Sequence, residues 1–322
     1  MKDNSKKNAY SRFFTRLLVL VLFVGVLDFT AGSILRYFYF KQQSGLLYRT
    51  TYALEKTAED VLILGSSRAN HHYIPEEFEK KLGLSSYNAG RDGQFIFYHY
   101  AVLQSVLKRY TPKMVILDFT SSDLRDDSRG YERLSSLYPY YKNHPELRGV
   151  AELKGPFEKF KLWSSIYPYN SSIFTIAVGN AEFNKKRTED IKGFVPLRKE
   201  WNRPLETDSL QEALKIDSLK LYYFESFIKD CAERKVKLYI VNSPTFRKFS
   251  FPDPYIALAK NIAATYQVPF WDYYQDPAFL KNEGKLFSDA THLNGKGAVF
   301  FSGVLINRIQ AEKDVIGSNE TK

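Results

Sequence analysis

The sequence predicts a three-layer α/β fold, in which five mostly parallel strands lie between layers of helices. Beyond residue 45, short apolar runs alternate with stretches of helical spacing, which is the pattern of a parallel sheet covered by helices. The composition, 44% hydrophobic and 25% charged, is that of an ordinary globular protein. We therefore expect an α/β domain over 46–313, preceded by an N-terminal segment of 1–45 and followed by a disordered tail of 314–322.

Five short apolar runs are the predicted strands, and helical patterns separate them. The strands lie at residues 60–66, 85–90, 113–120, 237–243 and 268–273. The predicted helices lie at residues 75–83, 94–110, 208–235, 254–267 and 295–313. Parallel strands need such crossover connections, so this order favours one parallel sheet.

The segment 124–206 interrupts this alternation. It contains several prolines, two aromatic clusters and a charged run, and it is too long to be a plain loop between a strand and its crossover helix. We expect a lid or a substrate-contacting subdomain with little regular structure. The alternative is an elaboration that only packs against the domain.

The N-terminal segment has the composition of a membrane anchor. Nineteen residues lie between Arg16 and Arg36, and Asp28 is the only charged one among them. This length spans a bilayer as a helix, and the positive charges before it place the N-terminus in the cytoplasm and the domain outside. A charge such as Asp28 costs about 2.5–3.5 kcal/mol at the bilayer centre and less towards its edge. A signal peptide cleaved near residues 31–33 is the alternative.

The charge and cysteine content exclude several classes of protein. The formal net charge is +10. Five basic residues and one aspartate in the first sixteen positions account for +4 of it. The rest of the chain carries the remaining +6 and contains no long basic block. Such a distribution does not indicate nucleic-acid binding. A single cysteine, Cys231, excludes a disulfide framework and a multi-cysteine metal site, and we expect neither a metal nor a cofactor.

Ser67 follows the first predicted strand in the stretch "LILGSSRAN" and is a candidate nucleophile. Such a serine needs a base, and the base needs a group that orients it. His292 has Asp289 three residues before it, in the loop after the last strand. Loops at the carboxyl edge of a parallel sheet gather together, so a Ser67–His292–Asp289 triad is possible. The alternatives are that Ser67 and Asp289 only cap helical turns.

The other four histidines are weaker candidates for the base. His71 and His72 follow Ser67 too closely to fold back on it from one helix, His99 lies within a predicted helix, and His144 lies in the irregular segment.

Four short blocks of the chain resemble those of the SGNH (GDSL-type) hydrolase family, in the usual order. They are "LILGSSR", "YNAGRDGQ", "DFTSSDL" and "SDATHLN". The first resembles the nucleophile block, with Ser66 in place of an aspartate and Ser67 as the nucleophile. The last matches the block that supplies the acid and the base, here Asp289 and His292. The resemblance implies a three-layer, flavodoxin-like fold and acyl transfer through an acyl-serine.

The resemblance also implies an oxyanion hole, and here the sequence departs from the family. The second block implies the backbone N–H of Gly93, with Gly90 in reserve, whereas the third block has Ser122 where the family has an asparagine. Loss of one oxyanion donor costs about 10²–10³ in rate. Three outcomes are open. Ser122 can donate to the oxyanion through a water, or Arg68 or Asn88 can contact the substrate and replace the asparagine donor. Otherwise the protein is slow or inactive. The alternatives are that the glycines only form turns and that Arg68 only holds the insert by a salt bridge.

The anchor and the insert make the chain similar to membrane-anchored bacterial SGNH-like esterases and acyltransferases. This implies a single-pass protein of the cell membrane, with its domain in the periplasm or outside the cell. The expected function is ester hydrolysis or O-acyl transfer on acylated cell-surface polysaccharides or lipids, with envelope-assembly proteins as possible partners. The aromatic residues of the insert could stack on sugar rings or serve only in packing: Tyr138, Tyr140, Tyr141 and Trp163. The alternative is a non-catalytic glycan-binding or scaffold protein on a degenerate SGNH fold.

Overall fold

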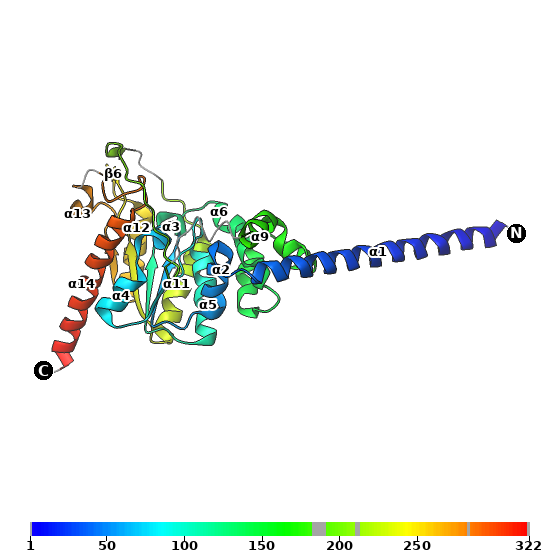
Figure 1. Ribbon diagram of the computed structural model, residues 1–322, viewed down its shortest axis with the longest axis horizontal. Coiled ribbons are helices and arrows are strands. Elements are labelled where there is room, and N and C mark those ends of the chain that lie inside the picture. The colour runs from blue at the N-terminus through cyan, green and yellow to red at the C-terminus, as the bar shows by residue number, and fades with distance from the viewer. Residues whose placement is uncertain (1, 182–190, 210–212, 282–283, 321–322) are drawn as a thin grey trace.

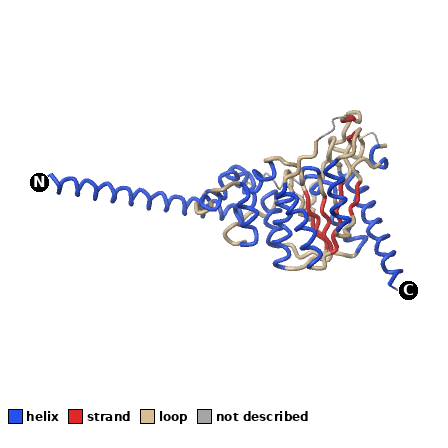
Figure 2. The backbone as a smooth tube through the Cα atoms, turned by 180° about the vertical axis from the view of Figure 1, so that it is seen from behind, coloured by secondary structure: helices blue, strands red, loops and turns tan. Residues whose placement is uncertain are grey.

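The computed structural model describes residues 2–181, 191–209, 213–281 and 284–320. Its centre is a parallel sheet of five strands in the order β2-β1-β3-β5-β7 (Figures 1 and 2). The strands are β1 (Val61–Gly65), β2 (Ser86–Asn88), β3 (Met114–Asp118), β5 (Lys237–Asn242) and β7 (Phe270–Asp272). Every neighbouring pair is parallel, which confirms the predicted fold class.

Successive side chains of the strands enter two separate cores, one on each face of the sheet. On β1, Leu62 and Leu64 join the core beneath one helical layer, and Val61 and Ile63 join the core beneath the other. This alternation follows from the pleat of a strand, and both faces are apolar because helices cover both. The first layer contains α5 (Ile96–Arg109), α11 (Ser218–Glu233) and α12 (Pro254–Thr265). The second contains α3 (Ser67–His72), α4 (Pro75–Leu82) and α14 (Gly295–Glu320).

Three of these helices begin or end at residues that suit those positions. Pro75 occupies the first turn of α4, and Gly83 ends that helix with φ +65°, a left-handed conformation that favours glycine. The carboxylates of Asp217 and Asp253 accept hydrogen bonds from the first amides of α11 and α12. The helix predicted from 208 therefore starts only at Ser218, and α14 continues to Glu320, so helix replaces the disordered tail that was predicted from 314 to 320.

The insert between β3 and α11 is a chain of short helices rather than the irregular segment that the sequence predicts. They are η2 (Ser121–Asp123), α6 (Arg129–Glu132), η3 (Arg133–Tyr140), η4 (Pro145–Leu147), α7 (Arg148–Ala151), η5 (Glu152–Lys154), α8 (Glu158–Lys161), η6 (Tyr167–Ser172) and α9 (Ile173–Asn180). Several of them contribute to the same core as α5 through residues such as Leu137, Leu147 and Tyr169. The insert is thus part of the folded domain.

A small second sheet pairs β4 (Glu206–Asp208) with β6 (Arg247–Phe249), and the short helix α13 (Pro277–Leu280) lies near it (Figure 1). At the other end, α1 (Lys2–Phe40) projects from the domain as one helix of 39 residues. The short helices α2 (Gly45–Thr51) and η1 (Tyr52–Lys56) connect it to β1. Part of α1, from Lys7 to Phe40, is long and apolar enough to cross a membrane.

Candidate active site

Ser67 stands at the first position of α3, directly after the carboxyl end of β1. The turn between them requires glycine at position 65: Gly65 has φ +148°, and a Cβ there would lie 2.8 Å from both the Cβ of Ala69 and the carbonyl oxygen of Asp118. The N-cap position belongs to Ser66, and no side-chain hydrogen bond caps the helix there. Ser67 therefore does not serve as a cap, and its hydroxyl faces the carboxyl edge of the sheet.

The structure brings Ser67, His292 and Asp289 together. The Ser67 Oγ lies 2.8 Å from the His292 Nε2, and the His292 Nδ1 lies 2.9 Å from the Asp289 Oδ2. Burial raises the pKa of Asp289, but hydrogen bonds from the His292 ring and the Thr291 amide outweigh it and hold that pKa below its ordinary value. An ionised Asp289 accepts a hydrogen bond from the His292 Nδ1–H, which leaves Nε2 as an acceptor for the serine hydroxyl.

The loop that carries His292 is held in place by His72, a residue that the sequence made a weak candidate for the base. The backbone N–H of Leu293 donates to the His72 Nε2 at 2.9 Å, so the opposite nitrogen, Nδ1, carries the proton and donates to the Ser243 Oγ at 2.9 Å. Burial lowers the pKa of His72 well below its ordinary value, so its ring is neutral. His72 thus joins α3, the end of β5 and the loop after β7.

Arg68, a predicted substrate-binding residue, makes its hydrogen bonds to other groups of the protein. Its guanidinium donates to the carbonyl oxygens of Ser243 and Phe119 and to the Asn242 Oδ1, and it lies 3.2 Å from the Asp118 carboxylate. Only 6% of the residue is exposed. Its bonds connect the carboxyl ends of β3 and β5 beneath the site. The predicted alternative was that Arg68 holds the insert by a salt bridge, but its ion pair in the structure is with Asp118 of β3.

A cleft of about 500 Å³ opens over the triad. Ser67 and His292 line it, together with Gly93, Ser122 and residues from the insert and from β6. Gly93 has φ +69° and lies at the turn before α5, where its backbone faces the same cleft as the serine. Gly93 and Ser122 therefore line the same cleft as Ser67, and their role as oxyanion donors stays a prediction.

Gly90 and Asn88 do not line this cleft. The Gly90 N–H donates to the Asn88 Oδ1 at 2.9 Å, and the Asn88 Nδ2 donates to the carbonyl oxygens of Ala69 and Tyr73. These bonds fasten the end of β2 to α3. The predictions that Gly90 is a reserve oxyanion donor and that Asn88 contacts the substrate are therefore wrong, because both groups are used within the fold.

The third block forms the short helix η2, which places Ser122 at the cleft and Asp123 inside the protein. Asp123 is 1% exposed, and burial raises its pKa to about 6 against the hydrogen bonds from Thr120. The His99 Nε2 lies 3.7 Å from its carboxylate. Lys220, also buried, donates to the Ser122 carbonyl oxygen at 3.1 Å and holds this turn against α11.

Gln94 is a cleft residue that the sequence did not single out. It follows Gly93, is 3% exposed and lines the cleft with a side-chain amide, the group that the third block lacks. Its Nε2 donates to the Ser136 Oγ of the insert at 3.3 Å, and its Oε1 is buried without a hydrogen-bond partner in the described part of the chain. Its position next to the predicted oxyanion glycine is the signal that could have identified it.

Arginines give the cleft a positive charge. Arg125, Arg129 and Arg247 line it, and the only carboxylate among its described lining residues is that of Asp253. That carboxylate accepts hydrogen bonds from the Ser121 hydroxyl and from two amides at the start of α12. Arg129 is also paired with Asp127, which lies outside the cleft lining, at 3.0 Å.

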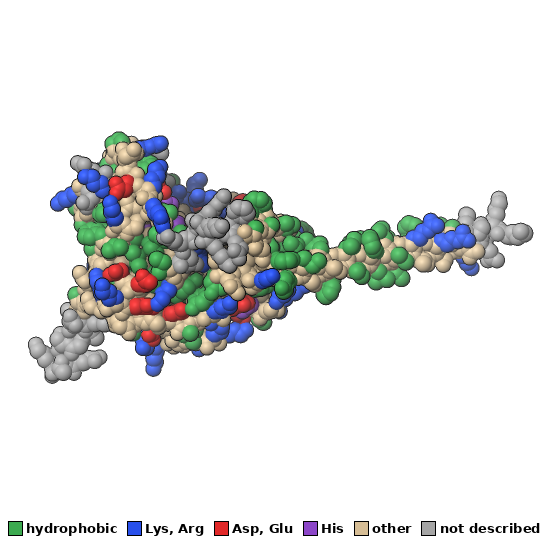
Figure 3. All heavy atoms as spheres, viewed as in Figure 1, with side chains coloured by type: hydrophobic (Ala, Val, Ile, Leu, Met, Phe, Trp, Pro, Cys, Tyr) green, Lys and Arg blue, Asp and Glu red, His purple; other side chains and the backbone are tan. Residues whose placement is uncertain are grey.

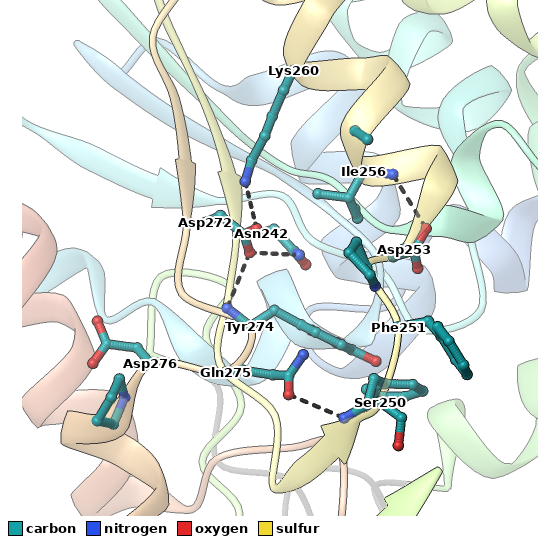
Figure 4. A pocket seen from close by; sticks show the side chains of 14 residues that line it. Asn242, Ser250, Phe251, Asp253, Ile256, Lys260, Asp272, Tyr274, Gln275 and Asp276 are labelled. Atoms are coloured by element: carbon teal, nitrogen blue, oxygen red, sulfur yellow. Dashed lines mark hydrogen bonds and ion pairs between the residues drawn. The ribbon is translucent and has the colours of Figure 1, made fainter. Parts of the chain in front are cut away.

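A second cavity, of about 660 Å³, adjoins the cleft on the side of β7. Figure 4 shows Lys260 reaching Asp272, which in turn faces Asn242. Asn242 lines both cavities and accepts a hydrogen bond from Arg68. A continuous polar chain therefore leads from the brace behind the triad into the second cavity.

The four aromatic residues considered for sugar stacking lie away from the cleft lining. The Tyr138 hydroxyl donates to Glu158, that of Tyr140 bonds to the Thr51 hydroxyl at 2.7 Å, and that of Tyr141 donates to Glu152. Trp163 is 74% exposed and lies in the part of the insert beside α1. The aromatic residues that do line the cleft are Phe95, Phe249, Phe251 and Tyr274.

Comparisons with known proteins give little beyond this geometry. No protein-family model matches the chain, and no curated protein matches it. Among solved structures, the fold is similar to that of a Bacteroides fragilis NCTC 9343 protein described as a "putative acylhydrolase", with a TM-score of 0.37 and 15% identity over 86% of this chain and 99% of the other. A likeness at that level assigns no activity to this chain.

Proposed function

We propose that the protein is a serine esterase or O-acyltransferase that works through an acyl-serine intermediate. The observation that carries this proposal is the row of hydrogen bonds from Ser67 through His292 to Asp289, at 2.8 and 2.9 Å. The Ser67 Oγ attacks the ester carbonyl while the His292 Nε2 takes its proton and passes it to the leaving alcohol. Water or a second hydroxyl then attacks the acyl-serine, again with His292 as base, and regenerates the serine.

The negative oxygen formed in each step needs donors beside the nucleophile. The backbone N–H groups of Ser67 and Gly93 are the proposed pair, because Ser67 begins a helix and Gly93 lines the cleft. In place of the family's asparagine, the side chains of Ser122 and Gln94 are the candidates for a third donor. Both line the cleft. Arg68 lines it too, but its Nη1 and Nη2 groups donate to Ser243, Phe119 and Asn242, and the Asn88 amide donates to Ala69 and Tyr73.

The surroundings of the site favour a substrate that carries negative charge. Arg125, Arg129 and Arg247 line the cleft, and Asp253 has the only carboxylate among its described lining residues, although Arg129 is also paired with Asp127. A carboxylate or phosphate on an acylated glycan or lipid would be attracted by this charge. We therefore propose an acidic acylated polysaccharide or lipid of the cell surface as the substrate.

The proposed location is the outer face of the cell membrane, with α1 retained as the anchor. Asp28 accepts hydrogen bonds from the Ser164 hydroxyl and the Ser165 amide, at 2.5 and 2.6 Å, so the domain is built onto the helix rather than merely connected to it. A cleavage near residues 31–33 would remove that contact, which favours the anchor over a signal peptide.

A second candidate is a non-catalytic glycan-binding or scaffold protein, and the serine in place of the family's asparagine favours it. Labelling with a fluorophosphonate probe separates the two, because the probe reacts only with an activated serine. Labelling that is lost in Ser67→Ala and retained in the neighbouring control Ser66→Ala supports the enzyme. A folded wild-type chain that takes up no probe between pH 6 and pH 9 supports the scaffold.

A further inference from the structure

We propose that part of the insert forms an apolar collar around α1 and lies in the outer leaflet of the bilayer. The collar consists of Phe157, Phe160, Trp163, Ile173 and Phe174. The inference rests on the proposed crossing of the membrane by α1, but it does not depend on the proposed catalysis.

The collar residues expose large apolar side chains at one end of the domain. Phe174 is 81% exposed, Trp163 74%, Phe157 65%, Phe160 56% and Ile173 49%. Figure 3 shows apolar side chains along α1 and on the adjoining end of the domain. Single exposed apolar residues are common on soluble proteins, but a group of large ones marks an interaction surface.

Both parts of the collar are fixed to α1. Directly after Trp163, the Ser164 hydroxyl and the amides of Ser165 and Ile166 donate to the Asp28 carboxylate. The backbone of Ser165 also packs so closely on Gly32 that a Cβ there would lie 2.3 Å from it. Beyond Phe174, at the end of α9, the Asn180 Nδ2 donates to the Phe38 carbonyl oxygen at 2.8 Å. The insert therefore accompanies α1 over residues 28–38.

The length of α1 requires the bilayer to reach this region. Asp28 lies twelve positions after Arg16, which at a rise of about 1.5 Å per residue is about 18 Å. The hydrocarbon layer is about 30 Å thick, so a span that begins after Arg16 extends about eight residues beyond Asp28. A span that begins after Arg12 covers about 24 Å before Asp28 and is still too short, and tilting the helix increases the deficit. The collar, which starts beside Asp28, then lies within the outer leaflet.

The polar groups of this region fit that depth. A carboxylate in the apolar layer is costly unless it has partners, and the insert provides Asp28 with two amides and a hydroxyl. Tryptophan is enriched where lipid meets water, and the long side chain of Lys159 on α8 can reach the headgroups, whereas Lys161 is paired with Glu158 at 2.8 Å. The exposed apolar surface of α1 continues into the collar, which favours lipid over a second copy of the chain as the occupant.

Spin labels on the full chain in vesicles of phosphatidylcholine and phosphatidylglycerol test the collar. Labels go onto Phe160→Cys and Phe174→Cys, with Val24→Cys on the bare part of α1 as the lipid reference. Val299→Cys, on α14 and 51% exposed, is the water reference. Cys231 is buried, so the wild-type chain serves as the unlabelled blank. The measured quantity is the collision rate of each label with oxygen relative to a water-soluble nickel complex.

We expect the labels at positions 160 and 174 to favour oxygen, as the label at 24 does, while the label at 299 favours nickel. Nickel-favouring labels at 160 and 174 would overturn the collar, and a nickel-favouring label at 24 would overturn the crossing on which it rests. Spin–spin broadening at 174 that disappears on dilution with unlabelled chain would identify a second copy as the occupant and also overturn it. Fluorophosphonate labelling of the same samples reports separately on the serine, so the two proposals can fail independently.

Discussion

At the carboxyl edge of the sheet, polar side chains from distant parts of the chain bond to one another around an open cleft. At the anchor end of the insert, Asp28 is the polar group that the insert surrounds, and large apolar side chains face outward. The first region is formed by parallel strands that end at the same edge, which brings together residues separated by 225 positions. The second is formed by one helix and the segment folded against it. The comparison teaches that the fold separates the two proposed roles: the polar cleft lies at the sheet edge, and the exposed apolar side chains lie at the anchor end.

The largest effect is expected at the sheet edge, when the proposed base His292 is removed. We expect His292→Ala to lower kcat/KM for a p-nitrophenyl ester by about 10³-fold or more, because the His292 Nε2 is the proposed acceptor of the Ser67 proton. His144→Ala is the matched control: it removes a histidine that pairs with Glu55 and Glu146 in the insert region. Equal losses in both variants would show that the effect is one of folding.

A second experiment asks which side chain replaces the missing asparagine. Loss of a true oxyanion donor should lower kcat by about 10²-fold or more with little change in KM. We expect this from Gln94→Ala or Ser122→Ala, but not from the control Ser135→Ala, whose side chain lies outside the cleft lining. Steady-state kinetics on the same ester would decide, and unchanged kcat in both cleft variants would leave the backbone amides as the donors.

The packing of the insert on α1 can be disrupted by a substitution that lies away from the cleft. Gly32→Val forces a side chain into the Ser165 backbone and should destabilise the packing of the insert on α1 by about 1–3 kcal/mol. Limited proteolysis of the vesicle-bound chain should then cut the insert sooner, whereas fluorophosphonate labelling of Ser67 stays unchanged. Gly25→Val, at a glycine whose Cβ would meet nothing within 4 Å, is the control. A loss of labelling in Gly32→Val alone would show that the two regions are coupled.

The smallest expected effect concerns pH and the buried Asp123. Burial raises its pKa to about 6, so between its ordinary value and pH 6 the folded state holds a proton that the unfolded state has lost. Its contribution to stability is therefore greatest at pH 4 and is lost as the pH rises through 6. Asp123→Asn carries no charge at any pH, so the stability of wild type relative to this variant should fall from pH 4 to pH 7. Thermal unfolding at each pH measures this, and a constant difference would contradict the assignment.

The sequence was sufficient for the sheet and for the convergence of the triad residues. Apolar runs identify buried parallel strands, and the loops after such strands must meet at one edge, so the order of strands and helices is enough to bring Ser67 and His292 together. The supporting residues could not be assigned in this way. Arg68, Asn88 and Gly90 are used by carbonyl oxygens and side chains whose positions depend on the packing of α3 against the sheet.

The insert was predicted less well for a related reason. Its helices are only three to eight residues long, too short for a clear period in the sequence, and they form because neighbouring elements cover their apolar faces. The contacts of His72 and Gln94 were equally hidden, because each pairs with a residue far along the chain, Ser243 or Ser136.

The bond between Asp28 and the insert has one more consequence. Because α1 enters the domain as one unbroken helix and Ser164 and Ser165 bond to it, the domain has a fixed orientation relative to α1. If α1 crosses the membrane as proposed, the cleft is held at a fixed distance and orientation relative to the lipid surface, and the proposed substrate would have to reach the cleft at that distance.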